Sequence, residues 1–324
     1  MKTRRLGKTG YEISEIGLGC WQLGGDFGPL GEETAKGILD AALGAGITFW
    51  DTADVYGGGL SESRIGAHGK GADVVVATKL GRSGALYPNQ YSRDGLRQSI
   101  LGSAQRLGVS TLDLVQLHCV PGEVLRDGAI FGWMDELRAE GLIRHWGASV
   151  ETIEEGLLCL DQPGCATLQI IFNLLRQDAA DELLPNAADK DVGIIVRLPL
   201  ASGLLSGKFS KDSVFEPSDH RNYNRDGAAF SVGETFSGIE FERGVELVQE
   251  LKGLAPEGMP MSRFALRWIL DHPQVSTVIA GVSKPEQIAD NVAASEARSL
   301  FPALRTQLGE WYRTEVKPEI RGAV

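Results

Sequence analysis

The sequence predicts an α/β protein, a (β/α)8 TIM barrel formed as one domain by residues 1–324. Short apolar runs rich in β-formers alternate with amphipathic stretches, which is typical of βαβ units. Runs such as Val74–Ala77 and Gly193–Val196 are apolar throughout, as in parallel strands buried on both faces. Eight such repeats favour a closed barrel, a fold that routinely uses about 250 residues or more. An open doubly wound sheet is the alternative.

The order of the predicted elements supports this fold class. The strands are expected at Ile16–Gly19, Ile47–Asp51, Val74–Lys79, Leu112–His118, Ile143–Ser149, Thr167–Phe172, Gly193–Pro199 and Ser276–Gly281. The helices between and after them are expected at Glu32–Ala45, Ser61–Gly69, Arg93–Leu107, Gly128–Glu140, Thr152–Leu160, Ala180–Lys190, Ser262–Asp271 and Lys284–Ala294.

Two segments lie outside the eightfold pattern. Residues 3–13 are expected to form an N-terminal hairpin, with its turn at Lys8–Gly10, that closes the bottom of the barrel. Residues 206–240 show no sustained periodicity and follow the seventh strand. A loop of this length in a compact domain is usually functional or disordered. It lies on the face of the barrel where active sites form.

Composition excludes several classes of protein. The chain is 43% hydrophobic and 23% charged, as globular proteins are, and its net charge of −11 disfavours nucleic-acid binding. No apolar run approaches a membrane span of about 20 residues, and no apolar run follows the N-terminal basic residues as in a signal peptide. The four cysteines form no CxxC pair, so we expect reduced thiols and a cytoplasmic location.

Polar side chains interrupt the apolar strands near their carboxyl ends. In a barrel these ends meet at one face, so residues far apart in sequence converge there. Because burying an unpaired charge costs several kcal/mol, a purely structural role is a poor explanation for polar residues at so many strand ends. The residues are Asp51, Lys79, His118, Ser149 and Gln169, with Tyr56 in the loop that follows Asp51.

These residue types suit reduction of a carbonyl group, which gains a hydride at carbon and a proton at oxygen. Tyr56 is the candidate proton donor, and a nearby Lys79 ammonium is expected to lower the pKa of its phenol. Asp51 is expected to keep Lys79 charged and in place. His118 is expected to donate a hydrogen bond that orients the substrate oxygen. The set therefore predicts general acid catalysis with stabilisation of a developing alkoxide.

The tetrad Asp51, Tyr56, Lys79 and His118 resembles that of the aldo-keto reductase superfamily. It stands in the motifs Phe49–Gly57, Ala77–Lys79 and Leu117–His118, and the likeness runs from about Leu6 to Ala294. The long loop after the seventh strand is more similar to that of the bacterial branch related to the potassium-channel β subunits than to that of the mammalian aldose reductases. The resemblance implies an NADP(H) cofactor bound without a Rossmann fold, and the chain has no GxGxxG motif.

The resemblance also implies the cofactor contacts. Ser149 and Gln169 match side chains that bond the carboxamide, and Phe172 matches the aromatic residue that stacks on the nicotinamide. Val150 stands where many relatives have Asn, so one carboxamide contact is missing. Other matching positions are Cys20 and Trp21 after the first strand, Pro199, Leu200, Ala201, Gly203, Leu204, Gly207 and Lys208 around the pyrophosphate, and Gly281, Ser283, Lys284, Gln287 and Asn291 around the adenosine phosphate. Lys284 is the first candidate for a contact with the 2′-phosphate on the adenosine of NADPH, and Arg221 in the long loop is the second.

No metal site is expected, because the five histidines show no HxH or HxxxH spacing. Cys119 follows His118 and is expected to face outward, and Trp21 is a candidate wall of the substrate site. The partner is expected to be a small carbonyl or alcohol, with no nucleic acid and no membrane. We predict a reductase of aldehydes or ketones. A sugar or alcohol dehydrogenase and a nicotinamide-binding redox sensor are the alternatives.

Overall fold

A computed structural model describes residues 1–69 and 71–323 of the chain. Its parallel strands close into a barrel in the order β10-β3-β4-β5-β6-β7-β8-β9. This closure confirms the predicted (β/α)8 fold and excludes the open sheet. The strands are β3 (Ile16–Gly19), β4 (Phe49–Asp51), β5 (Val75–Leu80), β6 (Leu112–His118), β7 (Ile143–Ser149), β8 (Cys165–Ile171), β9 (Gly193–Arg197) and β10 (Val275–Gly281).

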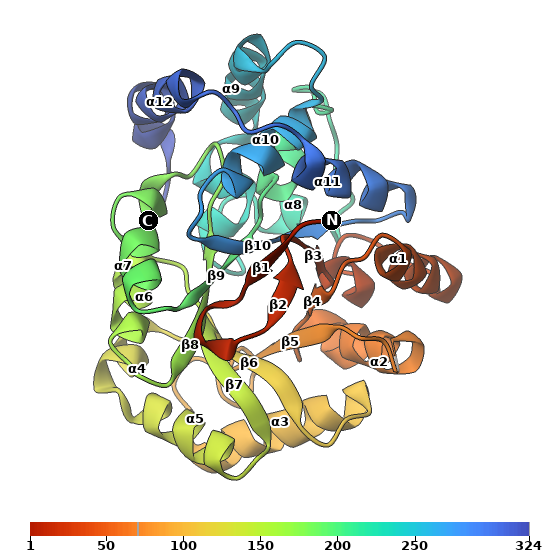
Figure 1. The fold of residues 1–324 in the computed structure, drawn as a ribbon, viewed down its shortest axis with the longest axis vertical. Coiled ribbons are helices and arrows are strands. Elements are labelled where there is room, and N and C mark those ends of the chain that lie inside the picture. The colour runs from red at the N-terminus through yellow and green to blue at the C-terminus, as the bar shows by residue number, and fades with distance from the viewer. Residues whose placement is uncertain (70, 324) are drawn as a thin grey trace.

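Helices surround the barrel (Figure 1). Those expected from the sequence are α1 (Glu32–Gly44), α2 (Leu60–His68), α3 (Arg93–Leu107), α5 (Ala129–Ala139), α6 (Ile153–Leu160), α7 (Leu183–Asp189), α10 (Met261–Leu270) and α11 (Glu286–Glu296). Four further helices were not expected from the sequence, and they are α4 (Gly122–Asp127), α8 (His220–Tyr223), α9 (Phe241–Leu254) and α12 (Pro302–Trp311).

Local sequence explains where the best predicted helices begin. The Ser92 side chain accepts a hydrogen bond from the Gly95 amide and caps α3. Thr152 and Glu155 form a reciprocal capping box at the start of α6. These bonds satisfy amide groups that the first helical turn leaves unpaired, so both starts fall within one residue of the expected position.

The N-terminal hairpin closes one end of the barrel, as predicted (Figure 1). Strands β1 (Thr3–Arg5) and β2 (Glu12–Ser14) pair antiparallel, and a short 3-10 helix lies between them. Leu6 and Ile13 pack inside the barrel against inward-facing residues of five strands. Gly7 adopts φ +50°, and a Cβ there would lie 2.2 Å from the Gly193 amide nitrogen. Only glycine permits this close approach.

The opposite end of the barrel carries the strand carboxyl ends and the long loop. Residues 206–240 include α8 and short 3-10 turns, and Arg321 near the C-terminus donates hydrogen bonds to the carbonyls of Gly238 and Arg225. The loop is thus fastened to the body of the protein. No helix within residues 1–69 and 71–323 has the length and apolar character needed to cross a membrane.

Candidate active site

The four predicted catalytic residues converge at the mouth of the barrel. Asp51 ends β4, Lys79 is the penultimate residue of β5 and His118 ends β6. Tyr56 begins the 3-10 turn that follows β4. Parallel strands bring these carboxyl ends together, so the convergence follows directly from the fold.

A close approach of two loops holds Tyr56 in place. Gly57 has φ +57°, and a Cβ there would lie 2.2 Å from the Gly24 carbonyl oxygen. The loop after β4 therefore rests directly on the loop after β3. The Trp21 ring stacks on the Tyr56 ring with centroids 5.7 Å apart. This packing leaves the phenol oxygen directed at Lys79.

Lys79 lies at the centre of the site and is only 1% exposed. Its ammonium donates hydrogen bonds to Asp51 Oδ1 at 2.6 Å, to the Thr52 carbonyl at 2.8 Å and to the Tyr56 oxygen at 3.1 Å. Three acceptors satisfy its three protons, which allows the charge to be buried. Burial alone would lower the pKa of Lys79, but Asp51 and Tyr56 outweigh burial and raise it.

The Tyr56 phenol is a weak acid in this setting. Burial raises its pKa to about 12, although the Lys79 ammonium lowers it and Asp51 raises it further. The expected effect of Lys79 is thus present, but desolvation of the phenolate exceeds it. Tyr56 therefore carries its proton at neutral pH, as a proton donor must.

His118 is a neutral imidazole. Burial lowers its pKa well below the usual value, and the cations Lys79, Arg82 and Arg197 lower it further. Its Nδ1 is buried and has no hydrogen-bond partner among the described residues. A neutral ring with an unsatisfied nitrogen in the cavity wall can bond a ligand there.

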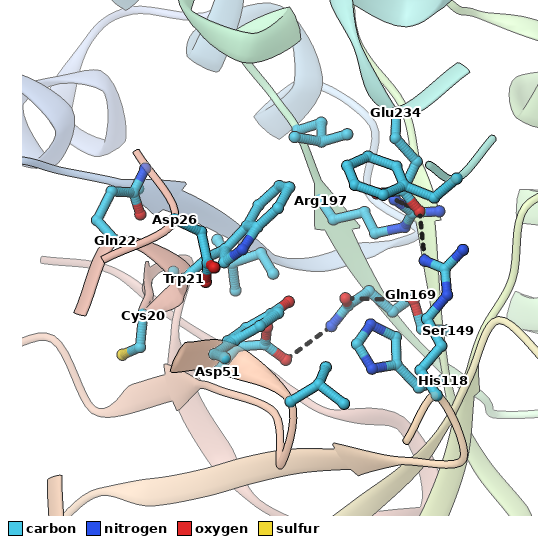
Figure 2. A pocket seen from close by; sticks show the side chains of 18 of the residues that line it. Cys20, Trp21, Gln22, Asp26, Asp51, His118, Ser149, Gln169, Arg197 and Glu234 are labelled. Atoms are coloured by element: carbon cyan, nitrogen blue, oxygen red, sulfur yellow. Dashed lines mark hydrogen bonds and ion pairs between the residues drawn. The ribbon is translucent and has the colours of Figure 1, made fainter. Parts of the chain in front are cut away.

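The Asp51 carboxylate accepts hydrogen bonds from polar side chains of the barrel interior. Its Oδ2 accepts hydrogen bonds from Gln169 Nε2 at 2.7 Å and from Gln116 Nε2 at 3.1 Å. Gln116 faces inward two residues before His118 on β6 and was not among the residues predicted for the site. The Gln169 amide oxygen also accepts a long hydrogen bond from Ser149 Oγ at 3.4 Å. Figure 2 shows Asp51, Ser149 and Gln169, from β4, β7 and β8, side by side.

A cavity of about 360 Å³ opens above these residues. Among the residues selected from the sequence, those that line it are Cys20, Trp21, Asp51, Tyr56, His118, Ser149, Gln169, Pro199 and Gly281. Aromatic side chains form much of its wall, and they are Trp21, Phe27, Tyr56, Tyr87, Tyr223 and Phe230. Trp21 therefore walls the cavity, as the sequence suggested.

The prediction that Phe172 faces the cavity is wrong. Phe172 is fully buried on the outer side of the barrel, where its ring packs against Trp268 and His272. Side chains alternate along a strand, and Gln169 faces inward, so a residue three positions later faces outward. By the same alternation, Ile171 and its register partner Arg197 on β9 face inward at this height, and Arg197 lines the cavity.

The segment that follows β9 forms an irregular turn beside the cavity. Leu198, Ala201 and Ser202 have positive φ angles, as do Gly203 and Gly207. Such conformations cost about 1–3 kcal/mol at residues other than glycine, so surrounding contacts must hold them. Leu200 and Lys208 are at least partly exposed, whereas Ala201 and Leu204 are buried.

Arg221 lies beside this turn. Its guanidinium pairs with Asp219 at 2.5 Å and lies over the Phe215 ring. A Cβ built on Gly203 would be 3.7 Å from Arg221 Nη1, so the cation is next to the predicted pyrophosphate loop. Lys284 is on a different loop, in the turn before α11.

The turn before α11 is capped by its own helix. The Gln287 amide oxygen accepts hydrogen bonds from the backbone amides of Ser283 at 2.7 Å and Lys284 at 3.1 Å. The Lys284 side chain is exposed, and Asn291 is buried. Gln287 therefore occupies the two amides that an anion would otherwise meet at this helix start.

A charged cluster in the cavity wall was not predicted from the sequence. Arg197 ends β9, Arg82 follows β5, and both pair with Glu234 of the long loop, at 3.1 Å and 3.3 Å. Arg82 also pairs with Glu151 at 3.2 Å. Arg197 carries the same signal as the tetrad, a charged residue at the end of an apolar strand. Glu234 carries no comparable signal, because its loop has no periodicity.

Cys119 belongs to this cluster, so the expectation that it faces outward is wrong. Its φ of +47° ends the regular alternation of β6. The sulfur lies 3.9 Å from Ser149 Oγ and 3.8 Å from both Glu234 and Arg197. The possible ligand atoms of Cys119, Glu151 and Glu234 lie within 4.8 Å of one another. Arg82 and Arg197 already supply the countercharge, so this group does not require a metal.

Comparisons with known proteins agree with this geometry. The model of the Aldo/keto reductase family matches residues 15–302. An aldo-keto reductase of Bacillus subtilis is 31% identical over 89% of this chain and 87% of its own length. A probable voltage-gated potassium channel subunit beta of Oryza sativa is 30% identical over 93% of each chain. The glycerol dehydrogenase structure from Gluconobacter oxydans has a TM-score of 0.79 and 27% identity, covering 100% of this chain and 98% of that one.

The family match covers most of the chain, and it includes the strands that carry Asp51, Lys79 and His118. It confirms the predicted class of enzyme, an NAD(P)H-dependent oxidoreductase, and the expected similarity to the potassium-channel β subunits. The chain belongs to the aldo/keto reductase family.

Proposed function

We propose that this protein reduces an aldehyde or ketone to an alcohol with a hydride from NADPH, and that Tyr56 donates the proton. The observation that carries the proposal is the buried chain of contacts from Asp51 through Lys79 to the Tyr56 oxygen, at 2.6 Å and 3.1 Å. It ends at a cavity whose wall also contains the neutral His118.

The cavity wall suits the nicotinamide end of the cofactor. Ser149 and Gln169 offer a hydroxyl and an amide where a carboxamide needs a donor and an acceptor, and both line the cavity. Arg197 Nε and His118 Nδ1 are buried polar atoms without a partner among the described residues, so the wall has unused bonding capacity. When bound there, NADPH supplies the hydride.

The protein's own residues manage the proton and the charge. The Tyr56 proton moves to the substrate oxygen as negative charge develops there, and the Lys79 ammonium stabilises the phenolate that remains. Asp51 keeps that ammonium charged and correctly placed. An N–H of His118 donates a hydrogen bond that orients the substrate oxygen. The aromatic wall limits the access of water.

The remaining predicted contacts belong to the same proposal. Cys20 and Trp21 border the nicotinamide end, and the turn from Pro199 to Lys208 meets the pyrophosphate. Gly281, Ser283, Lys284, Gln287 and Asn291 surround the adenosine phosphate. The position of Arg221 beside Gly203 supports a contact with the pyrophosphate rather than with the 2′-phosphate. The four cysteines are unpaired and buried, which supports a cytoplasmic location.

Replacement of Tyr56 by Phe tests the proposal. Tyr56→Phe should lower kcat for a general aldehyde by about 10²–10⁴, because one general acid contributes that much. The affinity for NADPH, measured by fluorescence titration, should stay within a few-fold of wild type. A variant that reduces aldehydes at close to the wild-type rate would exclude Tyr56 as the acid. A wild type that binds NADPH but turns over no carbonyl would favour the redox-sensor alternative.

A second candidate function is oxidation of a sugar or polyol by the same residues in reverse. The cavity sets the charged side chains Arg82 and Glu234 beside aromatic rings. Charged hydrogen-bonding groups next to aromatic faces suit a hydroxylated substrate. The similar structure from Gluconobacter oxydans is a glycerol dehydrogenase. Initial rates with NADP⁺ and a panel of polyols, compared with NADPH and the matching aldehydes, distinguish the two directions.

A further inference from the structure

Arg197 occupies an unusual position in the cavity. It is the last residue of β9 and is 7% exposed. Ile195 on the same strand packs inside the barrel, so Arg197, two residues later, also faces inward. Ile195 pairs in register with Gln169, which places Arg197 one inward-facing position closer to the mouth than Gln169. Figure 2 shows Arg197 near Gln169 and Ser149 in the cavity wall.

The Arg197 guanidinium is firmly held but not fully satisfied. It pairs with Glu234 Oε1 at 3.1 Å and donates to the Val150 carbonyl at 3.1 Å. Its Nε is buried and has no partner within the described part of the chain. Burial alone would raise the pKa of Glu234, but Arg197 and Arg82 lower it, so Glu234 is charged. The wall therefore contains a fixed, oriented ion pair with one unused donor.

This ion pair lines the same cavity as Ser149 and Gln169, the side chains that would hold a nicotinamide. Under the proposed function, on which this inference rests, Ser149 and Gln169 hold the carboxamide. The Cys119 sulfur contacts Ser149 Oγ at 3.9 Å and also Glu234 and Arg197 at 3.8 Å each. The expected aromatic partner of the ring, Phe172, is buried outside the barrel against Trp268. A ring held by Ser149 and Gln169 would therefore be near the charged guanidinium of Arg197 and not against the Phe172 ring.

The two redox states of the cofactor differ in charge at this ring. The nicotinamide is neutral when reduced and positive when oxidised, whereas the rest of the cofactor is the same. A fixed cation near the ring therefore weakens binding of the oxidised form only, and a fixed anion strengthens it. We propose that Arg197 and Glu234 together set the ratio of affinities for NADP⁺ and NADPH, with Arg197 disfavouring NADP⁺ and Glu234 limiting that effect.

Other charges near the Arg197–Glu234 pair do not change the direction in which each residue shifts the ratio of affinities for NADP⁺ and NADPH. Arg82 pairs with both Glu234 and Glu151, and Arg176 donates to the Glu151 carbonyl at 3.4 Å. These groups are present in every variant that changes only Arg197 or Glu234. Weaker binding of NADP⁺ than of NADPH would promote release of NADP⁺, the oxidised cofactor left after reduction. It would therefore favour the reductive direction.

The experiment measures Kd for NADP⁺ and NADPH in the wild type and in two variants by titration calorimetry. Arg197→Met removes the cation and should lower the ratio Kd(NADP⁺)/Kd(NADPH) about three- to tenfold. Glu234→Gln leaves Arg197 less compensated and should raise the ratio by a similar factor. General damage to the site weakens both forms together and cannot move the ratio in opposite directions.

Two further variants complete the test. Arg197→Lys keeps the charge and should retain a ratio within about twofold of wild type. Lys284→Ala acts on the phosphate that both forms share, so its ratio should also stay unchanged. Ratios that move in the same direction in Arg197→Met and Glu234→Gln, or that do not move, would overturn the inference while leaving the proposed function intact. A wild type that binds neither form would overturn both.

Discussion

Replacement of Lys79 by Met is the most informative single perturbation of this protein. The methionine side chain has a similar length but no charge. It removes three hydrogen bonds, to Asp51, to the Thr52 carbonyl and to Tyr56. The Asp51 carboxylate, in a residue that is 2% exposed, then keeps Gln116 and Gln169 as its donors among the described residues. The variant therefore combines loss of an electrostatic catalyst with a buried charge that has lost its partner.

The two effects have different sizes and can be measured separately. An uncompensated buried charge costs about 3–5 kcal/mol, so the midpoint of urea unfolding should fall clearly. Turnover should fall by about 10²–10⁴ or more, because Tyr56 loses the cation that stabilises its phenolate. Lys79 lowers the pKa of Tyr56, so its removal should move any alkaline limb of kcat/KM to higher pH.

The double variant Asp51→Asn/Lys79→Met separates stability from catalysis. Removing both charges leaves no unpaired ion, so most of the lost unfolding free energy should return. Turnover should stay low, because Tyr56 still lacks the ammonium. A single variant Lys79→Met that reduces aldehydes within a few-fold of wild type, with an unchanged alkaline limb, would refute the reasoning. Recovery of turnover in the double variant would also refute it.

Three other perturbations test separate parts of the structure. Lys284→Ala should weaken NADPH binding roughly tenfold and leave NADH binding unchanged, and a fluorescence titration that finds an unaltered preference would exclude this contact. Burial and Glu62 raise the pKa of Asp54 to about 7, so ionisation destabilises the fold as pH rises from about 4 to 7. Asp54→Asn should therefore be more stable than wild type at pH 8 but not at pH 4 in urea unfolding. Gly7→Ala should cost about 1–3 kcal/mol by overlap with the backbone, whereas Gly10→Ala, also at positive φ but with open space around it, should cost less.

The sequence alone predicted the barrel and the positions of the tetrad, for a physical reason. Short stretches of sequence determine both patterns, the continuously apolar strands and the alternation of strands with helices. Asp51, Lys79 and His118 stand out because a charged or polar residue at the end of an apolar strand is unexpected there. A closed barrel brings such ends together whatever the details of packing. That residues 1–324 form one domain stays a prediction.

Strand periodicity in the sequence predicts whether some side chains face into or out of the barrel, and for Phe172 it contradicts the position that the family resemblance implied. Gln169 faces the barrel interior, so strand periodicity alone puts Phe172 on the outer face. The same rule puts Arg197 inward with Ile195, as the structure shows. For Cys119 the rule fails, because β6 ends at His118 and the next residue adopts a positive φ.

Only the tertiary structure decided which parts of the long loop meet the site. Glu234 reaches Arg82 and Arg197 across gaps in sequence of 152 and 37 residues. No local pattern marks it, because a loop without periodicity carries no information about which of its residues turn inward. The balance of burial and charge at Tyr56 likewise depends on how deeply the phenol is covered. Spacing in the sequence indicates which groups meet, whereas their desolvation and pairing follow only from packing in three dimensions.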